Sequence, residues 1–167
     1  VDDLTVLDAA RKLGASYADV RVETVQETRI GLQDGEVEGL AEGAETGFAL
    51  RVLVKGAWGF ASSNDLAPES WRVALDRSLG LAAATSRTTK HKVRLADAPT
   101  LRKSVDWKPK KDPRKVSSED KLELLRRMEG EVRAVKGITN IQTSYADATV
   151  RKAFRSTDGT DLKWSLV

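Results

Sequence analysis

The 167-residue sequence predicts an α/β protein of the α+β kind, in which an antiparallel β-meander carries helices on one face and precedes another helix and further strands. Apolar residues recur at every second position in much of residues 18–62, as in strands with one buried face. They recur at spacings of three and four in three other segments, as in amphipathic helices. The composition, 40% hydrophobic and 32% charged, is that of a folded globular chain.

A short amphipathic helix is predicted to end near Leu13. Asp2 or Asp3 is placed to cap its N-terminus, and Gly14 stands where a helix commonly ends in a left-handed glycine. The predicted apolar stripe is Leu4, Leu7, Ala10 and Leu13.

The first strands of the meander are predicted to have one buried and one wet face. Apolar side chains at Val20, Val22, Ile30 and Leu32 mark the buried face, and Asp19, Arg21 and Glu23 mark the wet one. The pair Asp34-Gly35 tolerates the positive φ angles of a type I′ turn and predicts a hairpin.

The remainder of the meander is predicted from three segments. Glu36–Glu45 has the composition of a polar strand with a bend or bulges at its glycines. Thr46–Val54 alternates most clearly, with Phe48, Leu50, Val52 and Val54 on one side. A turn at Lys55-Gly56 leads to Ala57–Ser62, which gives a meander of four or five strands.

A second helix is predicted after Asn64 or Asp65, either of which can cap it. Its buried side is expected to hold Trp71, Ala74, Leu75, Ser78 and Ala82. Periodicity then fails over residues 87–115, which contain three of the four prolines and have a net charge of +8, against −5 for the rest of the chain. We therefore divide the chain into an N-terminal domain, residues 1–86, a basic connector, residues 87–115, and the start of a second domain, residues 116–167.

The second domain is predicted to begin with a helix capped by Ser117 and to reach Gly137. Its expected apolar stripe is Leu122, Leu125, Met128, Val132 and Val135. Two strands follow, one around Ile141–Tyr145 and one around Val150–Phe154, joined near residues 146–148, and Asp158-Gly159 predicts a turn. Because the chain begins at Val1 and ends in an apolar segment, we expect it to be part of a longer protein.

The sequence predicts no catalytic and no metal-binding residue, and its substrate-binding residues are unknown. Zinc hydrolases need about three protein ligands, whereas this chain has one histidine, His91, and no cysteine. His91 lies in the basic connector and is expected to be solvated. No G-x-S-x-G motif accompanies it, and Gly39, Gly43 and Gly47 lack the lysine of a phosphate-binding loop.

Three further binding hypotheses are weaker than their structural alternatives. The basic connector resembles a nucleic-acid-binding segment in charge, but only Trp107 is available for stacking, so a nucleic-acid partner is not favoured. Trp58, Phe60 and Trp71 are expected to pack together in the core instead of lining a ligand pocket. The acidic side chains of Glu36, Glu38, Glu42 and Glu45 are expected to be solvated, not paired for glycosidase chemistry.

The sequence predicts a cytoplasmic protein. The absence of cysteine fits a reducing compartment. No apolar run approaches the ~18 residues that span a bilayer, and the acidic start lacks the apolar centre of a signal peptide. A membrane partner is therefore not expected.

Three stretches together resemble the TldD/PmbA family, metallopeptidases also called modulators of DNA gyrase. These are Gly14–Glu23, the more specific Gly47–Ser62 with Asn64-Asp65-Leu66, and residues 112–159 with Asp112-Pro113, Ser117, Glu119, Lys121, Tyr145-Ala-Asp and Ser156-Thr-Asp-Gly. Tyr17-Ala-Asp-Val-Arg and Gly56-Ala-Trp-Gly-Phe are more similar to the TldD-like, metal-binding branch than to the PmbA-like partner branch.

The resemblance implies the N-terminal, substrate-handling and cavity-forming region of a zinc metallopeptidase that acts on unfolded or small modified peptides as a homodimer or heterodimer. The family's zinc motif, His-Glu-x-x-x-His, is absent here, so zinc is expected in the full-length protein but not on this chain, which is predicted to be inactive alone. The alternatives are a noncatalytic PmbA-like partner or scaffold subunit and, less favoured, a nucleic-acid-binding module through residues 87–115.

Overall fold

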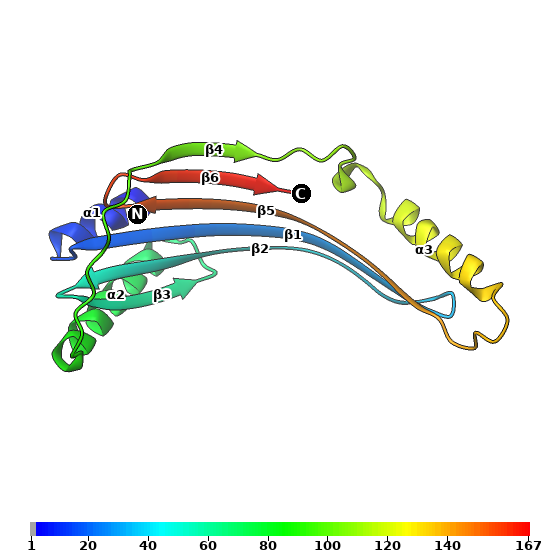
Figure 1. Cartoon of the computed structure of the whole chain (residues 1–167), viewed down its shortest axis with the longest axis horizontal. Coiled ribbons are helices and arrows are strands. Elements are labelled where there is room, and N and C mark those ends of the chain that lie inside the picture. The colour runs from blue at the N-terminus through cyan, green and yellow to red at the C-terminus, as the bar shows by residue number, and fades with distance from the viewer. Residues whose placement is uncertain (1–2) are drawn as a thin grey trace. The chain divides into compact units, whose positions relative to one another are not determined.

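The computed structural model describes residues 3–167 as an α+β protein with three α-helices and a six-stranded sheet (Figure 1). The helices are α1 (Asp3–Lys12), α2 (Pro68–Thr88) and α3 (Ser118–Arg133), with a 3-10 turn η1 (Pro113–Lys115). The strands are β1 (Tyr17–Gln33), β2 (Glu36–Val54), β3 (Ala57–Ser63), β4 (Arg102–Asp106), β5 (Gln142–Ser156) and β6 (Asp161–Leu166). Their order in the sheet is β3-β2-β1-β5-β6-β4, so β3 and β4 are its edges. The predicted fold class is confirmed.

The chain forms two compact units. Unit 1 contains the described residues up to Thr24, Glu45–Asp106 and Arg151–Trp164, and unit 2 contains Val25–Ala44, Trp107–Val150 and Ser165–Val167. Strands β1, β2, β5 and β6 each contribute residues to both units. The boundaries predicted at residues 87 and 115 stay a prediction.

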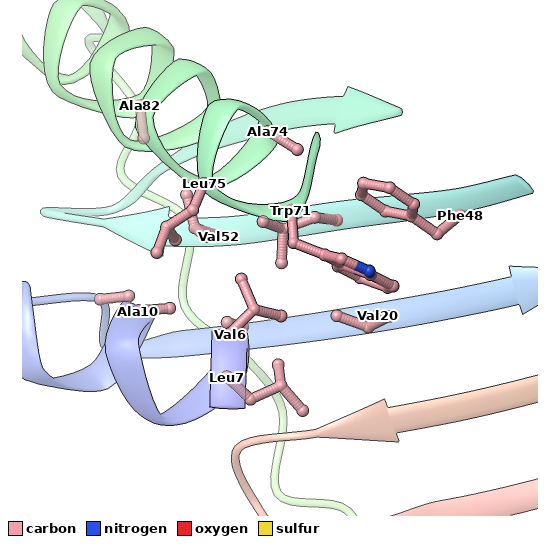
Figure 2. Close-up of a cluster of buried hydrophobic side chains, with 13 residues drawn as sticks. Val6, Leu7, Ala10, Val20, Phe48, Val52, Trp71, Ala74, Leu75 and Ala82 are labelled. Atoms are coloured by element: carbon pink, nitrogen blue, oxygen red, sulfur yellow. The ribbon is translucent and has the colours of Figure 1, made fainter. Parts of the chain in front are cut away.

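Unit 1 has a continuous hydrophobic core between its two helices and one face of its strands (Figure 2). Helix α1 contributes Val6, Leu7 and Ala10, while Leu4 and Leu13 are exposed. The predicted stripe was therefore wrong at both ends, because the helix turns Val6 inward. Gly14 has a φ of +93°, as expected for the end of a helix. The helix begins at Asp3, and the alternative cap, Asp2, lies outside the described residues.

The meander of unit 1 contains fewer strands than the sequence predicts. The segments Glu36–Glu45 and Thr46–Val54 are one strand, β2, because Gly39, Gly43 and Gly47 lie within it without a positive φ or a break. Residues 17–33 are likewise one strand. The meander thus has three strands instead of four or five. The turn Lys55-Gly56 has φ angles of 49° and 76°, and β2 then pairs antiparallel with β3 from Val54↔Ala57 to Phe48↔Ser63.

Helix α2 packs closely on β3. Its buried residues are the five predicted, Trp71, Ala74, Leu75, Ser78 and Ala82. A Cβ atom on Gly59 would lie 1.8 Å from the main-chain oxygen of Ser78, so only glycine permits this approach. The predicted cap was wrong, because the helix begins at Pro68 and Ala67 takes the capping position without a side-chain bond. The Asp65 carboxylate instead accepts the Ala67 N–H at 2.9 Å.

Strand β4 and parts of β5 and β6 complete unit 1. Within the connector, Arg102–Asp106 forms the edge strand β4, which the sequence did not indicate, and all five residues are exposed. The predicted turn before β6 is confirmed, since Gly159 has a φ of +91° and the Asp158 carboxylate accepts the Thr160 N–H at 3.0 Å. The strands predicted around residues 141–145 and 150–154 are a single strand, β5, without a turn between them.

Unit 2 has a small core made by Ile30, Leu32 and Leu125, with Leu122 and Tyr145 packed against it. The Asp34-Gly35 turn is confirmed, with φ angles of 52° and 91°. The Ser117 hydroxyl caps α3 by accepting the Asp120 N–H at 3.0 Å, as predicted.

The predicted stripe of α3 is wrong at three of its five positions. Its buried residues are Lys121, Leu125 and Glu129, whereas Met128, Val132 and Val135 are exposed. The polar residues are inside because each has a polar partner there. Lys121 Nζ lies 2.8 Å from Asp147 Oδ2, and the Thr143 hydroxyl donates to Glu129 Oε1 at 2.8 Å.

Candidate peptide-binding surface

The edge strand β3 presents main-chain groups that β2 does not use. Val54 and Ala57 flank a two-residue turn and therefore form a hydrogen-bonded pair, and such pairs alternate along antiparallel strands. Ala57, Gly59, Ala61 and Ser63 thus bond to β2, while the N–H and C=O groups of Trp58, Phe60 and Ser62 point away from it. Since β3 has no second neighbour in the sheet, these groups can accept another extended strand.

Alternate side chains of β3 lie on opposite faces of unit 1. Gly59 faces α2, and the register pairs Phe60 with Arg51 on the other face. On β1, Ala18 and Val20 belong to the core, so Tyr17, Asp19 and Arg21 share the face of Arg51. We call this the aromatic–arginine face, and it comprises Tyr17, Asp19, Arg21, Arg51, Trp58, Phe60 and Phe154.

A buried carboxylate organises the aromatic–arginine face. Asp19 is fully buried and accepts hydrogen bonds from Arg51, at 3.0 Å from Nε and 2.6 Å from Nη2 to Oδ2. Arg21 Nη1 lies 3.4 Å from Asp19 Oδ1. The prediction that Asp19 lies on a wet face was wrong, because two arginines from β1 and β2 cover its charge. Burying an unpaired carboxylate would cost several kcal/mol, which makes these pairs necessary.

Aromatic rings hold the arginines in place. The Arg51 guanidinium carbon lies 4.8 Å from the Trp58 ring centroid, and that of Arg21 lies 5.2 Å from the Phe154 centroid. Tyr17 meets Trp58 edge to face, with centroids 5.9 Å apart. Both cation–π contacts fall within the attractive range of about 6 Å. The face is therefore preorganised before any ligand arrives.

Two pKa values respond to this arrangement. The hydrogen bonds to Asp19 raise the pKa of the Arg51 guanidinium. Burial raises the pKa of the Tyr17 phenol, and the nearby Asp19 charge raises it further. At neutral pH the face thus carries fixed guanidinium charges beside a neutral phenol. It can bind and orient a ligand, but it contains no activated nucleophile.

A small pocket lies on the other side of the β3 edge. It has a volume of about 140 Å³ and is lined by Ala61, Ser62 and Ser63 of the strand and by Glu69, Ser70, Val73, Ala74 and Arg77 around α2. A strand added to β3 would direct alternate side chains to this pocket and to the aromatic–arginine face.

The aromatic residues considered in the sequence are separated by the fold. Trp71 is in the core and stacks on Phe48, with ring centroids 3.7 Å apart. Trp58 is half-buried on the opposite face, and Phe60 is 51% exposed. The prediction that Trp58, Phe60 and Trp71 pack together was therefore wrong, because strand alternation separates the first two from α2.

The other candidate residues do not belong to the aromatic–arginine face. His91 is exposed in the connector, as predicted. The four glutamates of β2 are also exposed, although Glu42 accepts a hydrogen bond from Ser118. The Asp19–Arg51 pair was missed as a site, although opposite charges on the polar sides of two predicted strands were a signal for it.

Zinc does not fit the residues that the structure describes. Between residues 3 and 167, no three His, Cys, Asp or Glu side chains gather in a group able to hold a metal ion. No step of metal chemistry can therefore be assigned to these side chains. In the same range, no helix is long and apolar enough to cross a membrane.

Comparisons with known proteins identify the family. Residues 18–82 match the model of the PmbA/TldA metallopeptidase domain 1, and residues 111–166 match that of the PmbA/TldA metallopeptidase central domain. Together the two matches cover more than half of the chain, which belongs to the PmbA/TldD metallopeptidase family. Within that family it corresponds to domain 1 and the central domain.

Curated relatives and solved structures agree with this assignment. A metalloprotease of Methanocaldococcus jannaschii is 26% identical over 88% of this chain and 32% of its own length. A metalloprotease of Synechocystis is 29% identical over 91% of this chain and 33% of its own length. The chain thus spans about a third of the length of these relatives.

Two solved structures share the fold. TldE from Thermococcus kodakarensis has a TM-score of 0.77 at 15% identity, covering 97% of this chain and 36% of that one. A protein from Bacteroides thetaiotaomicron named for modulation of DNA gyrase has a TM-score of 0.78 at 20% identity. The match covers 98% of this chain and 37% of that one.

Proposed function

We propose that this chain is the substrate-handling, cavity-forming region of a TldD/PmbA-type zinc metallopeptidase that acts on unfolded or small modified peptides. The observation that carries the proposal is the open edge of β3 between a preorganised polar face and a small pocket. Main-chain hydrogen bonds recognise any extended sequence, so such an edge suits a peptidase with varied substrates.

The aromatic–arginine face supplies selectivity beyond the main chain. The half-buried ring of Trp58 and the exposed ring of Phe60 offer apolar contact area beside the edge. Arg51 is 36% exposed, so its guanidinium can meet a substrate carboxylate or carbonyl while Asp19 holds it. We expect peptides with aromatic or acidic side chains at alternate positions to bind best.

The catalytic centre is proposed to come from the rest of a longer protein, as is the zinc. The curated relatives are metalloproteases about three times the length of this chain. Chelation of the parent protein is expected to abolish peptide hydrolysis and added zinc to restore it, while residues 1–167 alone should hydrolyse nothing. Hydrolysis by this segment alone would contradict the assignment.

A proline variant tests the strand-addition surface. Ser62→Pro removes an outward N–H from the edge without removing a hydrogen bond to β2, and Ser62→Ala is the matched control. In the parent protein, we expect the proline variant to raise KM about tenfold or more, with the alanine variant near wild type. One lost bond to an extended substrate accounts for about 1.4 kcal/mol of this effect.

Crosslinking locates the peptide independently of turnover. A photoreactive residue at Phe60 should capture a bound peptide, and the same residue at Arg72, which is exposed on α2, should not. Labelling only from Arg72, or equal KM values for the two Ser62 variants, would reject the β3 edge as the binding surface.

Three accompanying expectations remain proposals. Assembly as a homodimer or heterodimer is testable by mass photometry of the parent protein. A cytoplasmic location is testable by cell fractionation. A nucleic-acid partner is not expected, and retention of DNA or RNA by residues 87–115 at low salt would contradict this.

A further inference from the structure

The pocket between β3 and α2 opens at the free edge of the sheet. We call this pocket, which Ala61–Ser63 and one side of α2 line, the edge pocket. Ala61 pairs with Leu50, which is fully buried in the core, so the Ala61 side chain points toward α2. Ser63 pairs with Phe48 of the same core and points the same way. Ser62 lies between them and turns its main-chain groups outward, to where a peptide strand would be added.

Two polar side chains of the edge pocket already have partners. Glu69 Oε2 lies 2.8 Å from Arg72 Nη2. The Ser70 hydroxyl donates a hydrogen bond to the Asp65 carboxylate. Arg77 also lines the pocket, but it is exposed, and an exposed ion pair with an acidic ligand changes affinity by at most about fivefold. The polar lining therefore gives little preference for a charged substrate side chain.

Val73 gives the edge pocket its apolar surface. Its side chain is 37% exposed, although the neighbouring Ala74 is buried in the core. Ala61 adds a methyl group from β3. An aliphatic substrate side chain would cover these groups, and each CH₂ group that it buries changes affinity roughly fourfold. The edge pocket thus favours an aliphatic side chain over a polar one.

The size of the edge pocket limits what it can hold. Its volume is about 140 Å³, and an apolar cavity of about 150 Å³ holds a single benzene molecule. Along the strand, α2 touches β3 at Gly59, where a Cβ atom would lie 1.8 Å from the main-chain oxygen of Ser78. The pocket therefore does not extend in that direction. A side chain of leucine, isoleucine or methionine fits, and the larger indole of tryptophan does not.

We propose that the edge pocket selects a leucine-sized aliphatic side chain on the substrate, next to the residue whose side chain meets the aromatic–arginine face. This inference rests on the proposed function, because it requires a peptide strand along β3. The peptide residue that bonds to Ser62 shares the face of the Ser62 side chain, and its two neighbours point toward α2. The substrate class is thus a peptide with an aliphatic residue beside an aromatic or acidic one.

Competition between peptides in the parent protein tests the position of the selected residue. A serine–glycine host peptide carries one phenylalanine with the same residue X on both sides, so either strand direction places an X toward α2. With leucine as X, kcat/KM should exceed the value with alanine by about tenfold or more, and tryptophan should lose this advantage. Moving both leucines one residue further from the phenylalanine turns them to the other face and should remove most of the advantage.

Two substitutions of Val73 test the edge pocket itself. Val73→Trp fills the pocket and should reduce the leucine-to-alanine ratio of kcat/KM to below about twofold. Val73→Lys should raise the glutamate-to-leucine ratio about tenfold, because leucine loses apolar contact and glutamate gains an opposite charge. Unfolding cannot produce this gain. The matched control is Leu81→Trp, at an exposed position of α2 outside the pocket, which should keep the wild-type ratios.

The outcomes distinguish this inference from the proposed function. If Ser62→Pro raises KM but leucine has no advantage over alanine, or keeps its advantage in Val73→Trp, the peptide lies on β3 without using the edge pocket. That result overturns the inference and leaves the proposed function standing. If the two Ser62 variants have equal KM values and Val73→Trp leaves the ratio unchanged, the peptide binds elsewhere and both proposals fail.

Discussion

Units 1 and 2 bury their apolar residues to very different extents. Thirteen buried residues form one core in unit 1, whereas the core of unit 2 has only three, Ile30, Leu32 and Leu125. Unit 2 instead buries two charged residues of α3 and exposes its apolar stripe. Since apolar burial is the main favourable term in folding, unit 1 is expected to be the more stable part.

The difference separates a part of the chain with an extensive core from a part that leaves apolar side chains exposed. Unit 1 buries its apolar residues in one core and carries the open edge of β3 and the aromatic–arginine face, to which the peptide-binding proposal applies. Unit 2 leaves Leu124, Met128 and Val132 of α3 exposed.

Replacing the central aromatic residue of the unit 1 core should have the largest effect. Trp71→Ala removes the stacking on Phe48 and leaves a cavity, so we expect a loss of about 4 kcal/mol in unfolding free energy. Hydrogen exchange should accelerate mainly in unit 1. Leu125→Ala, in the small core of unit 2, should cost about 2 kcal/mol and accelerate exchange there, and equal losses throughout both units would contradict the comparison.

The close approach of α2 to β3 gives a second test of unit 1. Gly59→Ala places a Cβ atom 1.8 Å from the Ser78 oxygen, so the helix must shift, and we expect a cost of about 3 kcal/mol. The matched control is Gly80→Ala on the exposed side of α2, where the added Cβ atom would contact nothing within 4 Å. This change should stabilise the helix by about 0.5 to 1 kcal/mol. Urea unfolding measures both.

The aromatic–arginine face can be weakened without touching the core. Arg51→Met leaves the fully buried Asp19 carboxylate with Arg21 as its remaining cation. We expect the free energy of unfolding to fall by about 2 kcal/mol. The loss is smaller than for a wholly buried pair because Arg51 is partly exposed. Adding Asp19→Asn should recover part of this loss. A double-mutant cycle that finds no coupling would contradict the pairing.

The smallest expected effect concerns unit 2 at high pH. Burial, with a hydrogen bond to Asp147, raises the pKa of Tyr145 from 10.0 to about 12. The folded state therefore favours the protonated phenol, and this stability is fully present below pH 10 and lost as the pH rises toward 12. The Tyr17→Phe variant leaves Tyr145 as the only tyrosine of the chain, so tyrosinate absorbance reports it directly. Titration near pH 10 in the folded protein would contradict this.

Much of the local structure could be predicted from neighbouring residues. The turns at Asp34-Gly35 and Lys55-Gly56 follow from the positive φ that these pairs tolerate, and the buried side of α2 follows from its spacing. The α3 cap at Ser117 follows from a bond that spans three residues. Each of these features depends on interactions that are short in sequence.

The candidate site was less predictable because its residues are far apart in the chain. Asp19 and Arg51 are separated by 32 positions, and strand alternation alone assigned Asp19 to solvent. Likewise, the stripe predicted for α3 placed Met128 on the buried side and left out Glu129. Periodicity cannot reveal that the Thr143 hydroxyl donates a hydrogen bond to the Glu129 carboxylate in the folded protein. A residue's own polarity predicts exposure only when no distant partner compensates its burial.

By itself, the sequence determined where the backbone turns, which segments become helices and to which family the chain belongs. The tertiary structure alone decided that Asp19, Lys121 and Glu129 are buried and that Leu124, Met128 and Val132 of α3 are exposed. The reason is that turn and helix signals act within a few residues, while burial of a charge is stable only where folding brings a partner to within hydrogen-bonding distance.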